Sequence, residues 1–289
     1  TKQKLIALFD AKKKELLESS IDWQAEGIDI TAPGVSARAG HLHPITRLEH
    51  DIEDIFSSMG FDIADGPEIE MERYNFDALN FPKDHPSRDM QDTFWVKENP
   101  STGLRARKIK DHYLPRTHTS GVQVRYMEAH KPPLRVIVPG RVFRNEATDA
   151  SHEHTFHQFE CLMVDVEGQV TVATFKFVAE EFFSRFFGEK VSVRLRPSFF
   201  PFTEPSFEFD ISCILCSGKG CATCKQSGWL EIGGAGMVNQ RVFEAAGYKR
   251  GVYQGFAWGF GMTRLAMMKY KITDIRLLMS GDLRFIRQF

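Results

Sequence analysis

Apolar residues recur at helical spacing in two stretches of the chain. Within residues 44–59 they fall at i, i+3 and i+4 positions, and Pro44 suits a first helical turn whereas Gly60 suits a stop. Residues 172–186 repeat this spacing up to Gly188, with a stripe of phenylalanines along one face. We therefore predict two helices, and we interpret the stripe as part of a core rather than as a cofactor site.

A period of two replaces the helical spacing in other segments. Residues 191–196 and 207–212 alternate apolar with polar side chains, which is typical of half-buried strands. Residues 140–146 and 156–160 predict two strands joined by a loop, and the run 255–261 predicts another strand with its glycines on one face. Because the strands are short and turns link them, the pattern indicates an antiparallel sheet flanked by helices, an α+β fold.

The first forty residues differ from the rest of the chain. Residues 2–20 are rich in lysine and glutamate and predict an amphipathic helix, and a segment with Gly and Pro runs from there to Gly40 as a linker. The apolar side of this helix is formed by Leu5, Phe9, Leu16 and Leu17. We therefore divide the chain into residues 1–40 and a folded domain over residues 41–289.

The predicted hairpin at 140–160 carries the first chemical signal. Alternation sends Arg144 and Glu146 to one face of a strand, where the guanidinium can fork onto a phosphate and the carboxylate can accept from an exocyclic amine. One face of the return strand carries a ring and two polar groups, which are Phe156, Gln158 and Glu160. The combination suits an adenine nucleotide, although the hairpin alone also fits an ordinary solvated surface.

Composition narrows the class of protein without choosing a function. With 289 residues, 42% of them hydrophobic and 26% charged, the chain can bury one substantial core or two small ones. No apolar run is long enough to cross a membrane, and no secretory signal is present. A net charge of −1 and a pI near 6.8 are poor for a protein that holds a nucleic acid unaided.

Three segments occur in the order expected of one enzyme class. A helix, a strand and a proline over residues 43–67 precede the Phe-Arg-Asn-Glu run at 143–146, and the glycine-rich strand that ends in Arg264 follows. Together they resemble motifs 1, 2 and 3 of class II aminoacyl-tRNA synthetases. Longer strings are similar to the catalytic α subunits of bacterial phenylalanyl-tRNA synthetases; they lie at 74–95, 116–125, 156–160, 199–208 and 234–238.

The resemblance implies a fold, a reaction and a set of partners. We expect the class II catalytic fold, ATP-dependent activation of L-phenylalanine with Mg²⁺, and transfer of the acyl group to tRNA(Phe). The family works in the cytoplasm as an (αβ)₂ heterotetramer with a β subunit. A longer helical arm precedes the catalytic domain in this family, so we expect residues 1–40 to be the remnant of that arm and its linker.

The resemblance also assigns roles around ATP. Arg144 would bridge the α-phosphate and the substrate carboxylate, and together with Arg264 it would form the catalytic pair. His152 and Arg264 would contact the distal phosphates, Phe156 would stack on adenine, and Glu146 would complete the nucleotide site. Glu231 would help to hold Mg²⁺, whereas without the resemblance we would take Glu231 for a surface carboxylate on a strand.

Recognition of phenylalanine divides into a polar end and an apolar end. The resemblance assigns the ammonium and carboxylate groups to Trp95, His118, Ser120, Gln158 and Glu160. It assigns the wall around the ring to Phe200, Phe202, Thr203, Ala235 and Ala257. Two phenylalanines at i and i+2 can present ring edges to a substrate ring, and small residues at 235 and 257 leave room for it.

Two CxxC pairs suggest a second site. Cys213, Cys216, Cys221 and Cys224 are the four thiols of a loop at 213–224, and thiolates in such pairs favour tetrahedral Zn²⁺. The spacer between the pairs has the sequence SGKG, which is shorter than in most tetrathiolate sites. Free or redox-active thiols are the alternative. We expect a structural staple, remote from catalysis.

Two other classes of protein remain open at this stage. A non-catalytic relative acting as an interaction subunit would be expected to lack Arg144, Glu146 or Arg264, and the chain retains all three. A zinc-ribbon module that binds nucleic acid would need basic residues around its cysteines, whereas only Lys219 and Lys225 lie near them. Both alternatives rank below the synthetase.

Overall fold

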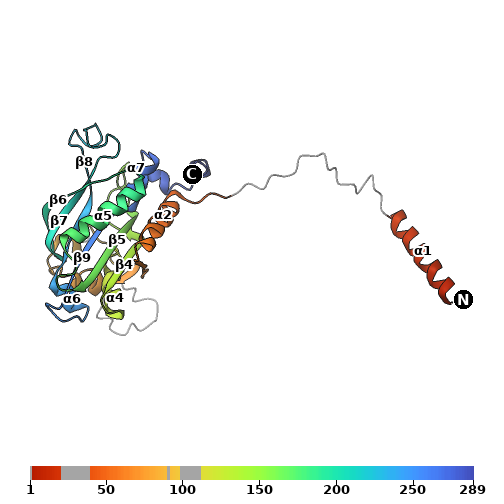
Figure 1. Ribbon diagram of the computed structural model, residues 1–289, viewed down its shortest axis with the longest axis horizontal. Helices are drawn as coiled ribbons and strands as arrows, with labels where there is room; N and C mark the ends of the chain where they lie inside the picture. The colour runs from red at the N-terminus through yellow and green to blue at the C-terminus, as the bar shows by residue number, and fades with distance from the viewer. Residues whose placement is uncertain (1, 21–39, 90–91, 98–111) are drawn as a thin grey trace. The chain divides into compact units, whose positions relative to one another are not determined.

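The computed structural model describes residues 2–20, 40–89, 92–97 and 112–289 (Figure 1). The chain divides into two compact units, residues 1–40 and residues 41–289. The first unit contains helix α1 (Lys2–Ser20), as predicted, while the predicted linker at 21–39 lies outside the described residues. The apolar side chains predicted to share one side of α1 are all exposed.

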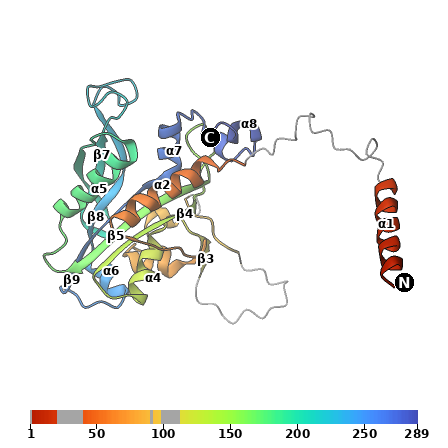
Figure 2. The ribbon, with the colours of Figure 1, turned by 45° about the vertical axis from the view of Figure 1, so that its right-hand side comes forward.

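A mixed sheet of seven strands organises the described part of the second unit (Figures 1 and 2). In spatial order its strands are β1 (Asp62–Ile63), β4 (Leu134–Phe143), β5 (Thr155–Val166), β9 (Tyr253–Gly261), β8 (Trp229–Val238), β7 (Thr203–Ser212) and β6 (Val193–Phe200). Every neighbouring pair is antiparallel except β1 and β4, which are parallel. The predicted α+β fold is confirmed, with one parallel pair at the edge that the prediction did not include.

Three helices cover one face of the sheet and enclose the main core. They are α2 (Pro44–Ser58), α5 (Val172–Phe187) and α7 (Met262–Tyr270). Phe56, Phe159, Phe182 and Trp258 pack in this layer, and each is at most 2% exposed. The phenylalanine stripe of α5 is therefore core, as predicted. Gly188 ends α5 with φ at +72°, a backbone conformation that glycine adopts without steric cost.

Short helices and a small ribbon cover only part of the opposite face. The elements are the ribbon of β2 (Ile69–Met71) and β3 (Tyr113–Pro115), with α3 (Glu72–Asn75), η1 (Asp77–Leu79), η2 (Pro86–Arg88), α4 (Ser120–Ala129) and α6 (Gln240–Ala245). A second apolar cluster forms beneath them, centred on residues such as Val136, Val138, Leu162 and Phe243. The chain ends with η4 (Ile275–Leu278) and α8 (Leu283–Ile286). This incomplete cover leaves the middle strands accessible from one side.

Most predicted elements form where the pattern places them, and one detail is wrong. Strand β4 ends at Phe143, so Arg144 and Glu146 lie in the loop beyond it instead of alternating along a strand. The last pair of β4 and β5 is Phe143 with Thr155, and Arg144 N–H adds one hydrogen bond to the His154 carbonyl at 2.9 Å beyond the end of the strand. Among the described helices, none is long and apolar enough to cross a membrane.

Candidate active site

A cavity of about 500 Å³ opens on the less covered face of the sheet. Strands β5, β8 and β9 form its floor, and residues from η1, α4 and the segment after β4 form its walls. Ten of the residues predicted to bind substrate line it: His118, Ser120, Arg144, Glu146, Gln158, Glu160, Phe200, Phe202, Ala235 and Ala257. Segments far apart in sequence therefore converge on one hollow.

A buried carboxylate marks the polar end of the cavity. Glu160 is 5% exposed and accepts hydrogen bonds from Ser120 Oγ at 2.7 Å, Gln123 Nε2 at 2.6 Å and Gln158 Nε2 at 3.0 Å. Burial raises the pKa of Glu160 to about 7, although the Ser120 hydrogen bond and the charge of Arg144 oppose the rise. At neutral pH this carboxyl is therefore close to its midpoint of titration, and a ligand that carries a positive charge would favour the ionised form.

Unpaired polar atoms face the same region. Neither ring nitrogen of His118 has a hydrogen-bond partner, and Gln158 Oε1 has none. Burial lowers the pKa of His118 to about 3, so this ring is neutral. Its face lies parallel to that of Phe81, with ring centroids 6.1 Å apart. Buried polar atoms without partners carry a desolvation cost of about 1–3 kcal/mol each, which a polar ligand would remove.

Arg144 lies between the polar end of the cavity and its opening. Its Nε donates to the Thr117 carbonyl at 3.3 Å, and its guanidinium lies 5.0 Å from the centre of the Phe156 ring. Burial lowers the pKa of Arg144, yet an arginine side chain keeps its charge at any physiological pH. This desolvated cation beside an aromatic face and near Glu146 is suited to an anionic ligand with a planar ring.

Aromatic rings and small residues form the apolar end. The rings of Phe200 and Phe202 stack at 5.7 Å between centroids. A side chain at Gly234 would press on the Phe200 ring, since a Cβ built there lies 2.9 Å from two of the ring carbons. Ala257 completes the wall without filling the space, whereas Ala235 borders the cavity but pairs with Trp258 and belongs to the helix-covered core. The volume and lining of this end suit a benzyl-sized group.

Several predicted binding residues lie outside the cavity lining. Trp95 donates from Nε1 to the Arg88 carbonyl at 3.2 Å and packs near Phe76, and the Thr203 hydroxyl bonds to Ser206 Oγ at 2.7 Å behind the wall. Phe156 lies under Arg144 at the rim. The remaining two, His152 and Arg264, are exposed, on the loop before β5 and in the first turn of α7.

A β-bulge decides the direction of Glu231. Cross-strand pairs of β7 and β8 run Glu208 with Gly234 and Phe209 with Gly233, and the register shifts so that Asp210 pairs with Glu231. Because paired residues share a face, the shift brings Glu231 to the face that Gly234 shares with the cavity. Strict alternation along β8 would have turned Glu231 toward the helices.

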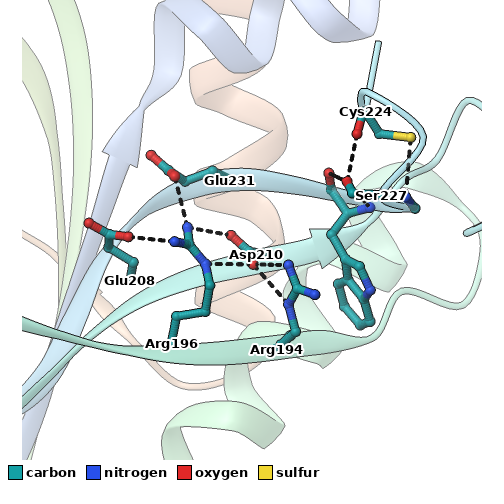
Figure 3. Close-up of polar contacts among 9 residues, drawn as sticks. Arg194, Arg196, Glu208, Asp210, Cys224, Ser227 and Glu231 are labelled. Atoms are coloured by element: carbon teal, nitrogen blue, oxygen red, sulfur yellow. Dashed lines mark hydrogen bonds and ion pairs between the residues drawn. The ribbon is translucent and has the colours of Figure 1, made fainter. Parts of the chain in front are cut away.

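An arginine network contacts Glu231 from one side (Figure 3). Arg196 Nη2 donates to Glu231 Oε2 at 2.8 Å, and Arg196 also binds Glu208 and Asp210. Asp210 is 2% exposed and accepts two further hydrogen bonds from Arg194. Glu231 is 56% exposed, so one side of its carboxylate remains open to a cation. Glu231 lies outside the cavity lining, on the same face of the sheet, and its charge and exposure suit the predicted Mg²⁺ ligand.

Four cysteines converge in the loop between β7 and β8. The sulfur atoms of Cys213, Cys216, Cys221 and Cys224 all lie within 4.8 Å of one another. Cys213 and Cys221 are 3.8 Å apart, and Cys216 and Cys224 are 3.9 Å apart, which matches the spacing of about 3.8 Å that Zn–S bonds of about 2.3 Å give at a tetrahedral centre. Backbone N–H groups of Gly220 and Gly228 donate to two of the sulfurs. The residues present fit a tetrathiolate metal site.

Sequence reasoning missed several of the lining residues, and two of them belong to the polar end. Gln123 lies one turn of α4 beyond Ser120 and donates to the same carboxylate, and Phe81 covers the ring of His118. Helical spacing within the segment 116–125 could have predicted Gln123, because residues three apart share a helix face. The approach of Phe81, which lies between η1 and η2, has no local signal in the sequence.

Comparison with known proteins identifies the class of protein to which this fold and cavity belong. The family model described as "tRNA synthetases class II core domain (F)" matches residues 27–289. A structure of pyrrolysyl-tRNA synthetase from Desulfitobacterium hafniense superposes with a TM-score of 0.58 at 14% identity, covering 97% of this chain and 83% of that one, and this likeness shows the fold alone. The sheet, the cavity and the family match together define a class II aminoacyl-tRNA synthetase.

Relatives of higher similarity narrow the class to one family. The chain is 52% identical to the phenylalanine–tRNA ligase alpha subunit of Shouchella clausii, covering 97% of this chain and 78% of that protein. It is 50% identical to the subunit of the same name from Geobacter metallireducens, covering 99% of this chain and 78% of the relative. The chain belongs to the phenylalanine–tRNA ligase alpha subunit family.

Proposed function

We propose that this chain activates L-phenylalanine with ATP and transfers the resulting phenylalanyl group to tRNA(Phe). The observation that carries the proposal is the single cavity that joins a buried carboxylate, a desolvated arginine and a benzyl-sized apolar end. Each part matches one part of the reacting complex. Membership of the phenylalanine–tRNA ligase alpha subunit family supports the same reaction.

The polar end of the cavity is suited to the backbone groups of the amino acid. The ammonium group would pair with Glu160, and the neutral His118, the Ser120 hydroxyl and Gln158 would supply the remaining hydrogen bonds. The ring would lie between the Phe200–Phe202 stack and the small wall residue Ala257. Trp95 and Thr203 would support this site from behind, and Ala235 would border the ring from the floor of the cavity.

The open end of the cavity is suited to ATP. Phe156 would carry the adenine ring and Glu146 would accept from its amine, while Arg144 would contact the α-phosphate. His152 and Arg264, both exposed, would contact the distal phosphates. Glu231 would hold a Mg²⁺ ion, which would supply charge neutralisation to the leaving pyrophosphate.

The reaction demands little acid–base chemistry from the protein. An ionised carboxylate oxygen of phenylalanine attacks the α-phosphorus, a new O–P bond forms, and the bond to pyrophosphate breaks. Arg144, placed between the two substrates, would hold the attacking and receiving groups in line and offset the charge that develops. Positioning and electrostatics therefore account for catalysis.

Phenylalanine-dependent exchange of pyrophosphate into ATP tests the proposal. Arg144→Ala is expected to lower the exchange rate by at least about a hundredfold, the scale of losing a charged group that stabilises the transition state. Arg135→Ala, an exposed change on the same strand that leads to Arg144, is the matched control and should keep the exchange rate. Full activity in a folded Arg144→Ala protein would refute the role of this arginine.

The four cysteines are proposed to hold a structural Zn²⁺ ion. Sulfur separations, N–H···S hydrogen bonds and partial burial of all four thiols support it. Metal analysis of the purified, unchelated protein should give about one zinc per chain, as one tetrathiolate site holds one ion. Cys216→Ser should lose the metal, whereas Cys161→Ala, at the buried thiol of β5, should keep it. A wild-type protein without zinc would leave the thiols free.

The proposed setting follows from the reaction. The relatives are described as alpha subunits, which implies a β subunit, and the two would form an (αβ)₂ heterotetramer. Because this chain has a net charge of −1, the β subunit would supply the basic surface for tRNA(Phe). A cytoplasmic location is proposed with it, because thiolates for zinc persist in a reducing compartment. Sedimentation of the two subunits alone and mixed tests the assembly.

A further inference from the structure

The four-cysteine loop closes the hairpin that carries Glu231. Cys213 comes directly after β7, and Gly228 directly before β8, and Cys213 N–H donates to the Gly228 carbonyl at 2.8 Å. The register of the two strands runs on from this closure, through Ser212 paired with Trp229. Because the loop of a hairpin fixes the register of its strands, the conformation of this loop bears on which residue of β8 lies beside Asp210.

That register matters for the direction in which Glu231 points. The bulge that turns Glu231 to the face of the cavity lies between Phe209 and Asp210, close to the loop end of the hairpin. A slip of one residue would send the carboxylate to the helix-covered face. The loop thus closes the end of the hairpin at which the predicted Mg²⁺ ligand is set.

The loop contains several tight turns, which short-range backbone hydrogen bonds join, such as Gly218 N–H to the Cys213 carbonyl at 3.1 Å and Gln226 N–H to the Cys221 carbonyl at 2.9 Å. Ser217, Lys225 and Gln226 have positive φ angles of 47°, 50° and 63°, which are uncommon for residues with side chains. Leu215 is 55% exposed, so this apolar residue of the loop adds little burial. The convergence of four sulfur atoms at metal spacing would tie these turns to one another through a bound ion.

A continuous path of contacts leads from the cysteines to Glu231 (Figure 3). The Ser227 hydroxyl donates to the Cys224 carbonyl at 2.6 Å, and the backbone N–H of Trp229 donates to the same hydroxyl at 3.2 Å. The guanidinium of Arg194 lies 4.6 Å from the centre of the Trp229 ring. These contacts join the base of the loop to the first residue of β8 and to β6.

The second half of the path passes through one buried carboxylate. Arg194 donates to Asp210 Oδ2 at 2.9 Å and 2.6 Å, and Arg196 Nε donates to the same oxygen at 2.9 Å. Arg196 Nη2 in turn donates to Glu231 Oε2 at 2.8 Å. Asp210 is almost fully buried, so loss of these arginine contacts would leave a buried charge unpaired, which costs free energy.

We propose that the tetrathiolate loop positions Glu231, through Trp229, Arg194, Asp210 and Arg196, and so sets the affinity of the active site for Mg²⁺. The inference rests on the proposed zinc in the loop and the proposed role of Glu231. It replaces the expectation of a staple remote from catalysis. Residues of the loop and of the arginine network are positioning residues, because they would act on the ion only through Glu231.

Two variants cut the path at different points. Cys216→Ser removes one sulfur from the loop, and Arg194→Gln leaves the sulfurs intact but breaks the link between Trp229 and Asp210. Lys219→Ala, an exposed change within the loop, is the matched control. All are measured in complex with the β subunit, for zinc content, for the Mg²⁺ concentration at half-maximal exchange and for the KM of phenylalanine.

The two variants should differ in zinc and agree in Mg²⁺ dependence. Cys216→Ser should lack zinc and Arg194→Gln should keep it, while both raise the half-maximal Mg²⁺ concentration by about tenfold, the lower end of the cost of losing an outer partner of a metal ligand. The KM of phenylalanine should stay within about twofold in both, since the polar end of the cavity belongs to other strands. Calorimetric titration of a non-hydrolysable ATP analogue should show the same tenfold loss with Mg²⁺ and none without it.

The possible outcomes distinguish a failure of the positioning role from a failure of the proposed synthetase function. Wild-type protein that exchanges pyrophosphate but contains no zinc would overturn the positioning role and leave the synthetase function standing. Unchanged Mg²⁺ dependence in zinc-free Cys216→Ser, or an equal rise in the KM of phenylalanine, would overturn it as well. Should Cys216→Ser fail to fold, wild-type protein stripped of zinc by a chelator and returned to Mg²⁺ gives the same comparison.

Discussion

At the scale of single residues, Glu160 combines a buried carboxylate with a polar shell. Three side chains donate to it, and burial raises its pKa to about 7. Below that pH the group is protonated and loses the charge that an ammonium ligand needs. We predict that the KM of phenylalanine rises as the pH falls from 8 to 6, approaching about tenfold per pH unit well below the pKa. Exchange kinetics across this range measure it.

The same pKa has a consequence for stability. The ordinary value for this carboxyl is 4.5, so the folded state holds the proton more tightly than the unfolded state. The contribution of Glu160 to stability is therefore full below pH 4.5 and is lost as the pH rises through about 7. Glu160→Gln should remove both the rise in KM and this component of the pH dependence of unfolding. A pH profile identical to that of the wild type would assign the titration to another group.

Ala257 sets the depth of the apolar end. It pairs across the strands with Gly236 and lines the cavity beside the Phe200–Phe202 stack. Removing its methyl group should admit para-substituted phenylalanines, and we predict that Ala257→Gly raises the kcat/KM of para-chlorophenylalanine relative to phenylalanine by about tenfold, the scale of one methylene in a pocket. Ala129→Gly, an exposed change at the end of α4, should leave the ratio alone. An unchanged ratio in Ala257→Gly contradicts the wall assignment.

At the scale of elements, helix α5 contributes four buried phenylalanines to the main core. Phe182 is fully buried and lies 4.8 Å from the rings of Phe56 and Phe183. Phe177 on the same helix is 67% exposed. We predict that Phe182→Ala lowers the free energy of unfolding by about 3–5 kcal/mol because it leaves a cavity, whereas Phe177→Ala changes it by less than about 0.5 kcal/mol. Urea denaturation of the two variants measures the difference. A similar loss of unfolding free energy in both variants would contradict the assignment of Phe182 to the core and of Phe177 to the surface.

At the scale of the whole molecule, the described apolar clusters belong to one unit. All members of both clusters come from residues 41–289, and the long apolar side chains of α1 are exposed within their own unit. We predict that a chain starting at His41 keeps its melting temperature within about 2 °C, which corresponds to a small change in unfolding free energy for a domain of this size. Differential scanning calorimetry of the two chains checks this, and a large drop would show that residues 1–40 stabilise the domain.

Local patterns in the sequence predicted most of the helices and strands discussed above. Helical spacing predicted α2 and α5, and alternation predicted the core of β6 and β7, because a regular element must bury one face and shows it in its period. The cavity-lining residues Gln158 and Glu160 were predicted in the same way. The end of β4 was missed, since the pairing that ends a strand comes from its neighbour and not from its own residues.

The amino-acid sequence by itself determined the fold class, the family motifs and the chemistry available at each position. Only the tertiary structure decided which of these groups meet. The bulge that turns Glu231, the approach of Phe81 to His118 and the gathering of four sulfurs all depend on contacts between segments distant along the chain. Such contacts leave no local period, because the side chain that completes them belongs to another element whose position is set by packing.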